Sequence, residues 1–123
     1  MERRPDVNVS AFSDVVRARV MARSGGFCEV RVAGCWDEAS QLHHRRPRGL
    51  GGSKSPATGR ASNALAVCTA CHTHLETVER GEARDRGWIV RQGADPREIP
   101  VYRYRQWVLL DDEGGLAPAG VVA

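Results

Sequence analysis

Apolar residues near the start of the chain recur with the period of a helix. In the segment 10–24 they lie four positions apart, the spacing of one helical face, at Phe12, Val16 and Val20. A serine, Ser10 or Ser13, can cap this helix, and Gly25-Gly26 provides a stop. The pattern therefore predicts an N-terminal helix.

The middle of the chain carries two short apolar runs and a second helical pattern. Residues 40–45 are a strand candidate, and residues 47–62 are rich in Gly, Ser, Pro and Ala, as is typical of a long loop. A second strand is predicted over 64–68, and a second helix over 70–80, which Gly81 ends. The expected order is strand, long loop, strand, helix.

Two β-like runs, 88–90 and 106–110, follow beyond residue 81. Each contains a tryptophan, Trp88 or Trp107, and together they predict a small hairpin packed on the rest of the protein. The expected fold class is α+β, with one compact core. Its parts are an arm and helix (1–24), a central core (25–80), a β extension (81–112) and a flexible tail (113–123).

The length of the chain limits the size of the core. A protein of 123 residues buries a modest share of its surface, so a metal ion or disulfides would add useful support. The sequence has no apolar segment of membrane-spanning length and no signal-peptide pattern. We therefore expect a cytoplasmic protein without a membrane partner. Cysteines in that reducing compartment favour metal binding over disulfides.

The four cysteines fall into two pairs. Cys68 and Cys71 form a C-x2-C turn, which directs two thiolates at one ion, and Cys28 and Cys35 form a wider pair on a glycine-containing loop. Two such pairs complete a tetrahedral shell, so we predict a structural zinc ion. Two disulfides, or a redox-active C-x2-C pair, are the alternatives.

All four histidines lie in a stretch without acidic residues. Between residues 39 and 75 there is no Asp or Glu. A charge run alone is more often a solvated loop, but a positive field that coincides with every histidine suits a phosphodiester substrate. If the substrate is a phosphodiester, we expect the basic residues of this window to contact DNA phosphates. They are Arg45, Arg46, Arg48, Lys54 and Arg60.

The ordered residues around these histidines resemble the HNH, or ββα-metal, nuclease motif. The resemblance covers about residues 28–80. It rests on Leu42-His43-His44-Arg45, Gly51-Gly52, Asn63-Ala64-Leu65 and Cys68-Thr69-Ala70-Cys71-His72. The form HHRRPRGLGG is similar to HNH proteins of actinobacterial phages. The resemblance implies a small ββα-metal nuclease core, with the zinc site, the N-terminal helix and the β extension built around it.

The motif implies a role for each matching residue. His43 corresponds to the first metal ligand, which is Asp in many members of the family, and His44 to the general base. Asn63 corresponds to the residue that orients the loop and the base, and His72 to the last ligand. Glu76, one helical turn after His72, corresponds to a frequent third ligand. Imidazole and carboxylate ligands suit Mg²⁺, Mn²⁺, Ni²⁺ or Zn²⁺ as the catalytic ion.

One geometric requirement accompanies this assignment. Neighbouring residues of a regular strand face opposite sides. His43 and His44 can therefore serve one site only at a twist, a bulge or a strand end.

The sequence thus predicts a metal-dependent endonuclease that nicks or cuts DNA. Its resemblance to phage proteins further implies a genome-packaging partner such as a terminase. The alternative is a non-catalytic zinc-stabilised module that binds DNA through the basic window, and such a module needs neither the histidine pair nor Asn63. A redox protein using Cys68 and Cys71 is a third hypothesis, which leaves the histidines unexplained.

Overall fold

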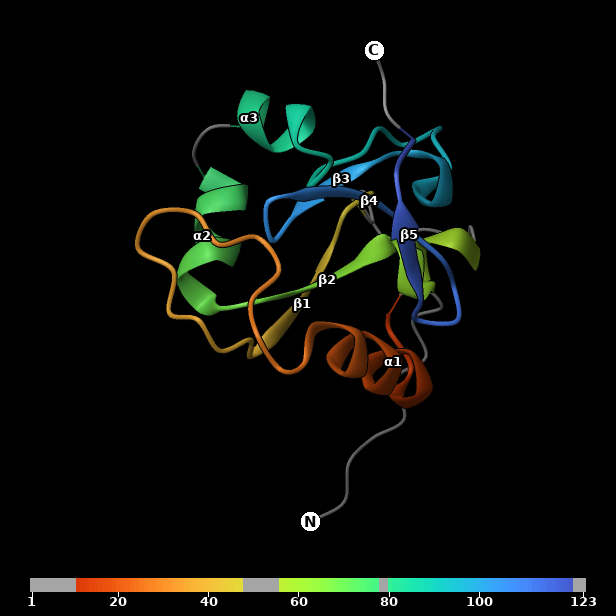
Figure 1. Ribbon diagram of the computed structural model, residues 1–123, viewed down its shortest axis with the longest axis horizontal. Helices are drawn as coiled ribbons and strands as arrows, with labels where there is room; N and C mark the ends of the chain where they lie inside the picture. Colours follow the sequence, from red (N-terminus) through yellow and green to blue (C-terminus); the bar gives the residue numbers. More distant parts are fainter. Residues whose placement is uncertain (1–10, 48–55, 78–79, 121–123) are drawn as a thin grey trace.

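The computed structural model describes residues 11–47, 56–77 and 80–120 and has mixed α and β structure (Figure 1). Its helices are α1 (Asp14–Ser24), α2 (Thr69–Thr77) and α3 (Arg80–Asp85). Its strands are β1 (Gln41–His44), β2 (Ala64–Val67), β3 (Val101–Arg103), β4 (Gln106–Leu110) and β5 (Leu116–Pro118). Short 3-10 turns occur at η1 (Pro56–Gly59), η2 (Ala61–Asn63) and η3 (Pro96–Glu98). In these described ranges no helix combines the length and apolar character needed to cross a membrane.

The N-terminal helix forms as predicted, with ends set by local chemistry. The Ser13 hydroxyl accepts the Val16 N–H at 3.2 Å and caps the first turn of α1. At the other end Gly25 takes the left-handed conformation, with φ 68°, that closes many helices. Ser10, the alternative cap, lies outside the described residues.

The predicted order of strand, loop, strand and helix is confirmed. β1 and β2 pair antiparallel, with His43 opposite Leu65 and His44 opposite Ala64, and α2 follows β2 directly. The described end of the long loop is not structureless, because η1 and η2 fold against the core there and bury Thr58.

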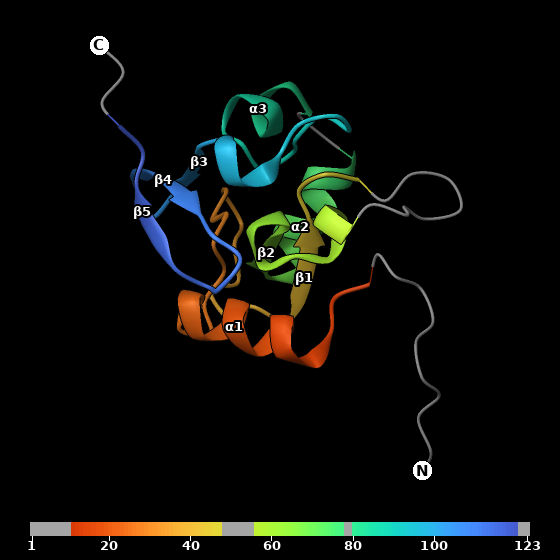
Figure 2. The same cartoon turned by 90° about the vertical axis from the view of Figure 1, so that its right-hand side faces the viewer.

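Both faces of β2 are buried, and its sequence explains how. Successive strand residues point to opposite faces. Leu65 and Val67 join the main core together with residues of α2, β3 and β4. Ala64 and Ala66 face α1 in a second, smaller cluster that includes Phe12. Their methyl side chains allow α1 to lie close to β1 and β2, below which it runs in the side view (Figure 2).

The C-terminal part differs from the prediction. β4 pairs with β3 and β5 in a three-stranded antiparallel sheet, so a sheet replaces the expected hairpin and part of the expected tail is ordered. The apolar run 88–90 is not a strand of this sheet. It is buried beside the end of β1, where the Val90 N–H donates to the Arg45 carbonyl at 2.8 Å. Burial, rather than pairing in the sheet, accounts for the apolar character of this run.

The predicted end of the second helix is also wrong. α2 ends at Thr77, and Gly81 lies inside the next helix, α3. Glycine does not have to end a helix, since it accommodates the right-handed helical conformation as well as the left-handed one.

A buried carboxylate connects the separate parts of the fold. Glu29 has no exposed surface and accepts hydrogen bonds from Arg23 at 2.7 and 2.9 Å, from Arg103 at 2.6 Å and from the Ala66 N–H at 2.9 Å. Burial raises the pKa of a carboxyl group, but these donors outweigh it and the pKa of Glu29 is lowered. Ionised Glu29 therefore links the end of α1 to β2 and β3.

We predict that Glu29→Gln lowers the free energy of unfolding by about 3–5 kcal/mol, because it leaves two buried guanidinium groups without their counter-charge. The matched control is Asp37→Asn, which breaks the exposed pair with Arg31 at 3.0 Å. Its effect should stay within about 1 kcal/mol. Urea unfolding of both variants measures the difference, and equal losses of stability would contradict the role of Glu29.

Candidate active site

The four cysteines converge at one place. Cys28 and Cys35 come from the segment between α1 and β1, and Cys68 and Cys71 come from the junction of β2 and α2. Their sulfur atoms all lie within 4.8 Å of one another. No disulfide joins them, and the sulfur atoms of Cys35 and Cys68 are 3.8 Å apart. The four thiols are therefore positioned to bind one metal ion, such as zinc.

Backbone N–H groups donate to two of these thiols, Cys68 and Cys35. The Trp36 and Cys71 N–H groups each donate to the Cys68 sulfur at 3.3 Å, and the Asp37 N–H donates to the Cys35 sulfur at 3.3 Å. Burial raises the pKa of Cys68, but the donated N–H bonds overcome this and lower it to about 7. A thiol that ionises so readily is a good ligand for a soft or borderline metal ion.

We predict one zinc ion per chain, released when an organomercurial reagent titrates the four thiols. Native mass spectrometry and a colorimetric zinc assay measure both quantities. Cys71→Ser should lower the zinc content and the thermal stability together, because the metal supports folding in small domains. A metal-free chain with two disulfides would contradict the prediction.

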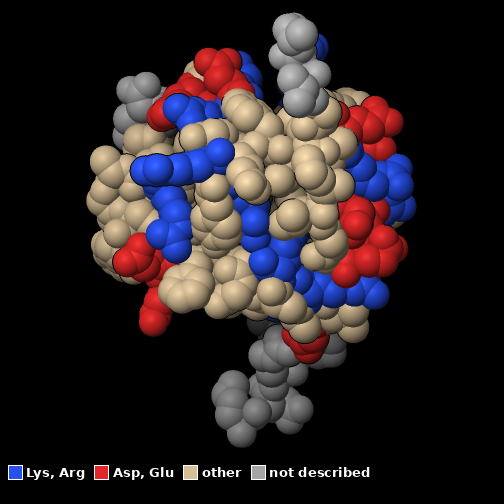
Figure 3. All heavy atoms as spheres, in the orientation of Figure 1, with Lys and Arg blue, Asp and Glu red and all other residues tan. Residues whose placement is uncertain are grey.

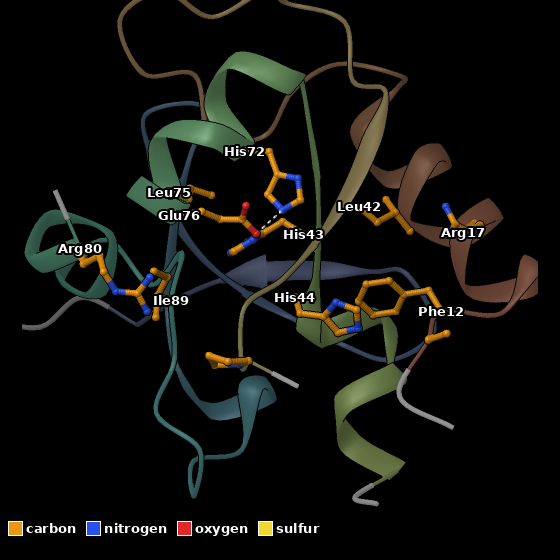
Figure 4. A pocket seen from close by; sticks show the side chains of 12 residues that line it. Phe12, Arg17, Leu42, His43, His44, His72, Leu75, Glu76, Arg80 and Ile89 are labelled. Atoms are coloured by element: carbon orange, nitrogen blue, oxygen red, sulfur yellow. Dashed lines mark ion pairs between the residues drawn. The ribbon is translucent and has the colours of Figure 1, made fainter. Parts of the chain in front are cut away.

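His43, His44 and His72 lie in a second place, a pocket between α1, β1 and α2 (Figure 4). His43 and His72 meet edge to face, with ring centroids 5.3 Å apart. The Glu76 carboxylate lies 3.4 Å from Nε2 of His72, one helical turn earlier on α2. Residues predicted as ligands of a second metal ion are thus brought into one pocket from β1 and α2.

The ring of His43 is held by the main chain of another segment. Its Nε2 lies 2.8 Å from the Trp88 carbonyl oxygen, which can only accept a hydrogen bond. Nε2 therefore carries the proton and Nδ1 keeps a lone pair. Burial is the main cause that lowers the pKa of His43 to about 4. A neutral imidazole with one nitrogen anchored to a carbonyl is the usual form of a metal-binding histidine.

Gly87, directly before Trp88, packs closely against the main chain at Pro100. Its φ of 76° is strained for other residues, and a Cβ atom there would overlap the Pro100 carbonyl oxygen.

The ring of His72 is oriented by a glutamine. Nδ1 of His72 lies 2.6 Å from Oε1 of Gln41, and Nε2 of Gln41 donates to the Thr69 hydroxyl at 3.2 Å. With the amide oriented in this way, Nδ1 of His72 is the donor and its Nε2 keeps the lone pair that faces Glu76. Sequence reasoning did not single out Gln41, because a glutamine at the start of a strand has no distinctive spacing signal.

The second site is looser than the first. Over the described part of the chain, the cysteine cluster is the one group of three or more such ligands whose atoms all lie within 4.8 Å. At the second site the close contacts are pairwise: His43 with His72, and His72 with Glu76. Their donor set, two imidazoles and a carboxylate, suits a divalent cation with open positions for water and substrate.

His44 reaches the pocket from the other face of β1. Its ring stacks on Phe12 with centroids 4.0 Å apart and an angle of 17° between the planes. It is the last residue of β1, and among the described residues this strand has a sheet partner on one side only. Both histidines line the pocket at this strand end, and the register of β1 with β2 is unbroken, so no bulge is involved.

Asn63 does not line the pocket but holds the ends of the long loop together. Its Oδ1 accepts the Arg46 N–H at 2.7 Å, and its Nδ2 donates to the Thr58 carbonyl at 2.9 Å. Its own carbonyl accepts the Arg45 N–H at 2.8 Å. This buried side chain therefore fixes the turn that directly follows His44.

The prediction that Arg45 contacts DNA is wrong. Arg45 has no exposed surface, and its guanidinium group donates to four main-chain carbonyls at 2.8–3.0 Å, those of Gly87, Ser62, Pro96 and Ile99. Burial lowers its pKa to about 9, so the group is still charged at neutral pH. A cation used in this way joins three segments of the chain, at η2, at Gly87 and at η3, and is out of reach of a phosphate.

The other basic residues of the window differ in their surroundings. Arg46 is half-buried and donates to the Ala94 carbonyl at 3.1 Å, and Arg60 lies 3.8 Å from the Asp112 carboxylate. Arg48 and Lys54 lie outside the described residues. On the face shown in Figure 3, basic and acidic side chains both occur, so this face is not uniformly basic.

Two arginines that the motif did not indicate line the histidine pocket. They are Arg17 on α1 and Arg80 on α3. No local signal distinguishes them, because an exposed arginine on a helix is common.

Comparison with known proteins adds no assignment. No protein-family model, curated protein or solved structure that was compared matches this chain.

We predict that the neutral ring of His72 is protonated at Nδ1, and that Gln41→Leu removes this preference because it deletes the acceptor. Long-range ¹H–¹⁵N correlation spectra at alkaline pH report the tautomer through the two ring nitrogen shifts. His74, on the same helix but outside the pocket, is the internal control and should not change. A wild-type His72 protonated at Nε2 would contradict the prediction.

Proposed function

We propose that this chain is a metal-dependent endonuclease of the HNH type that hydrolyses DNA phosphodiester bonds. The observation that carries the proposal is the meeting of His43, His72 and Glu76 in one pocket, with His44 beside them on β1. His43 and His44 come from β1, and His72 and Glu76 come from α2, the first strand and the helix of the strand–strand–helix unit.

Three of these residues would hold a divalent ion. Nδ1 of His43, Nε2 of His72 and the Glu76 carboxylate are the atoms that remain available once Trp88 and Gln41 have engaged the other ring nitrogens. Such an ion supplies a Lewis acid for the scissile phosphate and stabilises the departing 3′ oxygen.

His44 would act as the general base. An imidazole at this position can accept a proton from the water that attacks phosphorus. Its stacking on Phe12 at 4.0 Å restricts the ring to one plane. A base held in one orientation loses little freedom when the substrate binds.

Neighbouring residues would hold the base and the metal ligands in place. Asn63 fixes the turn after His44, and a zinc ion on the cysteines would hold Cys71, the residue directly before His72. Such support matters because a displacement of about 1 Å in a catalytic group can lower a rate about 100-fold. A phage terminase is the partner that the resemblance to phage proteins adds to this proposal.

The test is cleavage of supercoiled plasmid in the presence of Mg²⁺, Mn²⁺, Ni²⁺ or Zn²⁺, with EDTA as the blank. We expect nicked or linear products that depend on the metal. His44→Ala should lower the rate about 100- to 10,000-fold, the usual contribution of a general base. Zinc content and the circular dichroism spectrum should not change.

His74→Ala is the matched control. His74 lies on α2 but outside the histidine pocket, 3.9 Å from Glu82, so its loss should leave cleavage intact. Absence of cleavage with every metal, with DNA binding retained, would favour the zinc-stabilised binding module instead.

A further inference from the structure

Two arginines flank the histidines from elements outside the β1–β2–α2 unit. Figure 4 shows Arg17 of α1 and Arg80 of α3 on opposite sides of the pocket, with His43, His44 and His72 between them. The pocket is therefore bordered by positive charge at both ends.

The side chains of Arg17 and Arg80 do not stabilise the fold through polar contacts among the described residues. Both are exposed, and within residues 11–47, 56–77 and 80–120 neither guanidinium group has a hydrogen bond or ion pair. Three arginines are used in the interior instead, since Arg23 and Arg103 bind the buried Glu29 and Arg45 binds main-chain carbonyls. A guanidinium fork with unused donors beside a catalytic pocket is suited to a phosphate group.

The pocket continues on the side of Arg17. A second hollow shares Arg17, Leu42, His72 and Glu76 with the first and extends to hydroxyl-bearing residues of α2 and of the position just before β1. The hydroxyl-bearing residues that line it are Ser40, Thr69 and Thr73. Hydroxyl and guanidinium donors along one groove match the pattern by which proteins contact a nucleic-acid backbone.

We propose that Arg17 and Arg80 bind the DNA phosphates on the two sides of the scissile phosphate, so that the strand lies across the pocket from α1 to α3. This inference rests on the proposed nuclease function and adds its substrate contacts. The occupant is a phosphodiester backbone, because the groove offers a cation at each end, hydroxyls on the side of Arg17 and a ligand set for a divalent ion at its centre.

The experiment measures binding of a short fluorescent DNA duplex by the full chain over a range of salt concentrations. The background is His44→Ala, so that the probe stays intact. Each phosphate contact contributes about 0.9 to the slope of log K against log salt concentration. Arg17→Ala and Arg80→Ala should each reduce this slope by about 1 and weaken binding to all sequences alike.

Conservative and remote variants serve as controls. Arg17→Lys and Arg80→Lys keep the charge and should keep most of the slope. Arg91→Ala removes an exposed arginine that does not line the pocket and should leave the slope unchanged. Zinc content and circular dichroism confirm that each variant is folded.

The outcomes separate this inference from the function on which it rests. Wild-type slopes for both alanine variants, in a protein whose plasmid cleavage depends on His44, would overturn the role of the arginines and leave the nuclease in place. A slope reduced equally by Arg91→Ala would also overturn it, because the effect would then reflect net charge. A wild-type chain that neither binds nor cleaves DNA would overturn both.

Discussion

The ionised carboxylate of Glu29 is the constraint on which the arrangement of the other elements depends. It is fully buried and ion-paired with Arg23 and Arg103, and it also accepts the Ala66 N–H. A buried charge without a partner costs several kcal/mol, so the end of α1, strand β2 and strand β3 must assemble around this group together. Cys28 directly precedes Glu29, so the same contacts also place a ligand of the cysteine cluster.

The orientation of the side chains in the histidine pocket also depends on contacts between distant parts of the chain. Each histidine is oriented by a group from elsewhere in the fold: His43 by the Trp88 carbonyl, His72 by Gln41 and His44 by the Phe12 ring. The cysteine cluster adds a second anchor at the start of α2, beside His72. Two sites with separate tasks, one structural and one proposed to be catalytic, are therefore coupled through a few main-chain bonds.

Five arginines illustrate two uses of this residue that the sequence does not distinguish. Arg23, Arg45 and Arg103 are held by buried acceptors, and their positive charge serves the interior. Arg17 and Arg80 are exposed at the pocket. In the proposed DNA contact the positive charge comes from helices α1 and α3, whereas Arg45 of the acid-free window is a buried structural residue.

Local patterns were sufficient to predict α1, the order of β1, β2 and α2, and the grouping of the cysteines, because helical period, end caps and ligand spacing act over a few residues. The burial of Arg45, the orientation of His72 by Gln41 and the pairing of β3 with β4 and β5 were decided only by the tertiary structure. Arg45 illustrates the reason, since its side chain bonds to carbonyls 17 to 54 positions away. An arginine has the same donors whether it meets a phosphate or a buried carbonyl, and only the folded chain determines which of the two lies within reach.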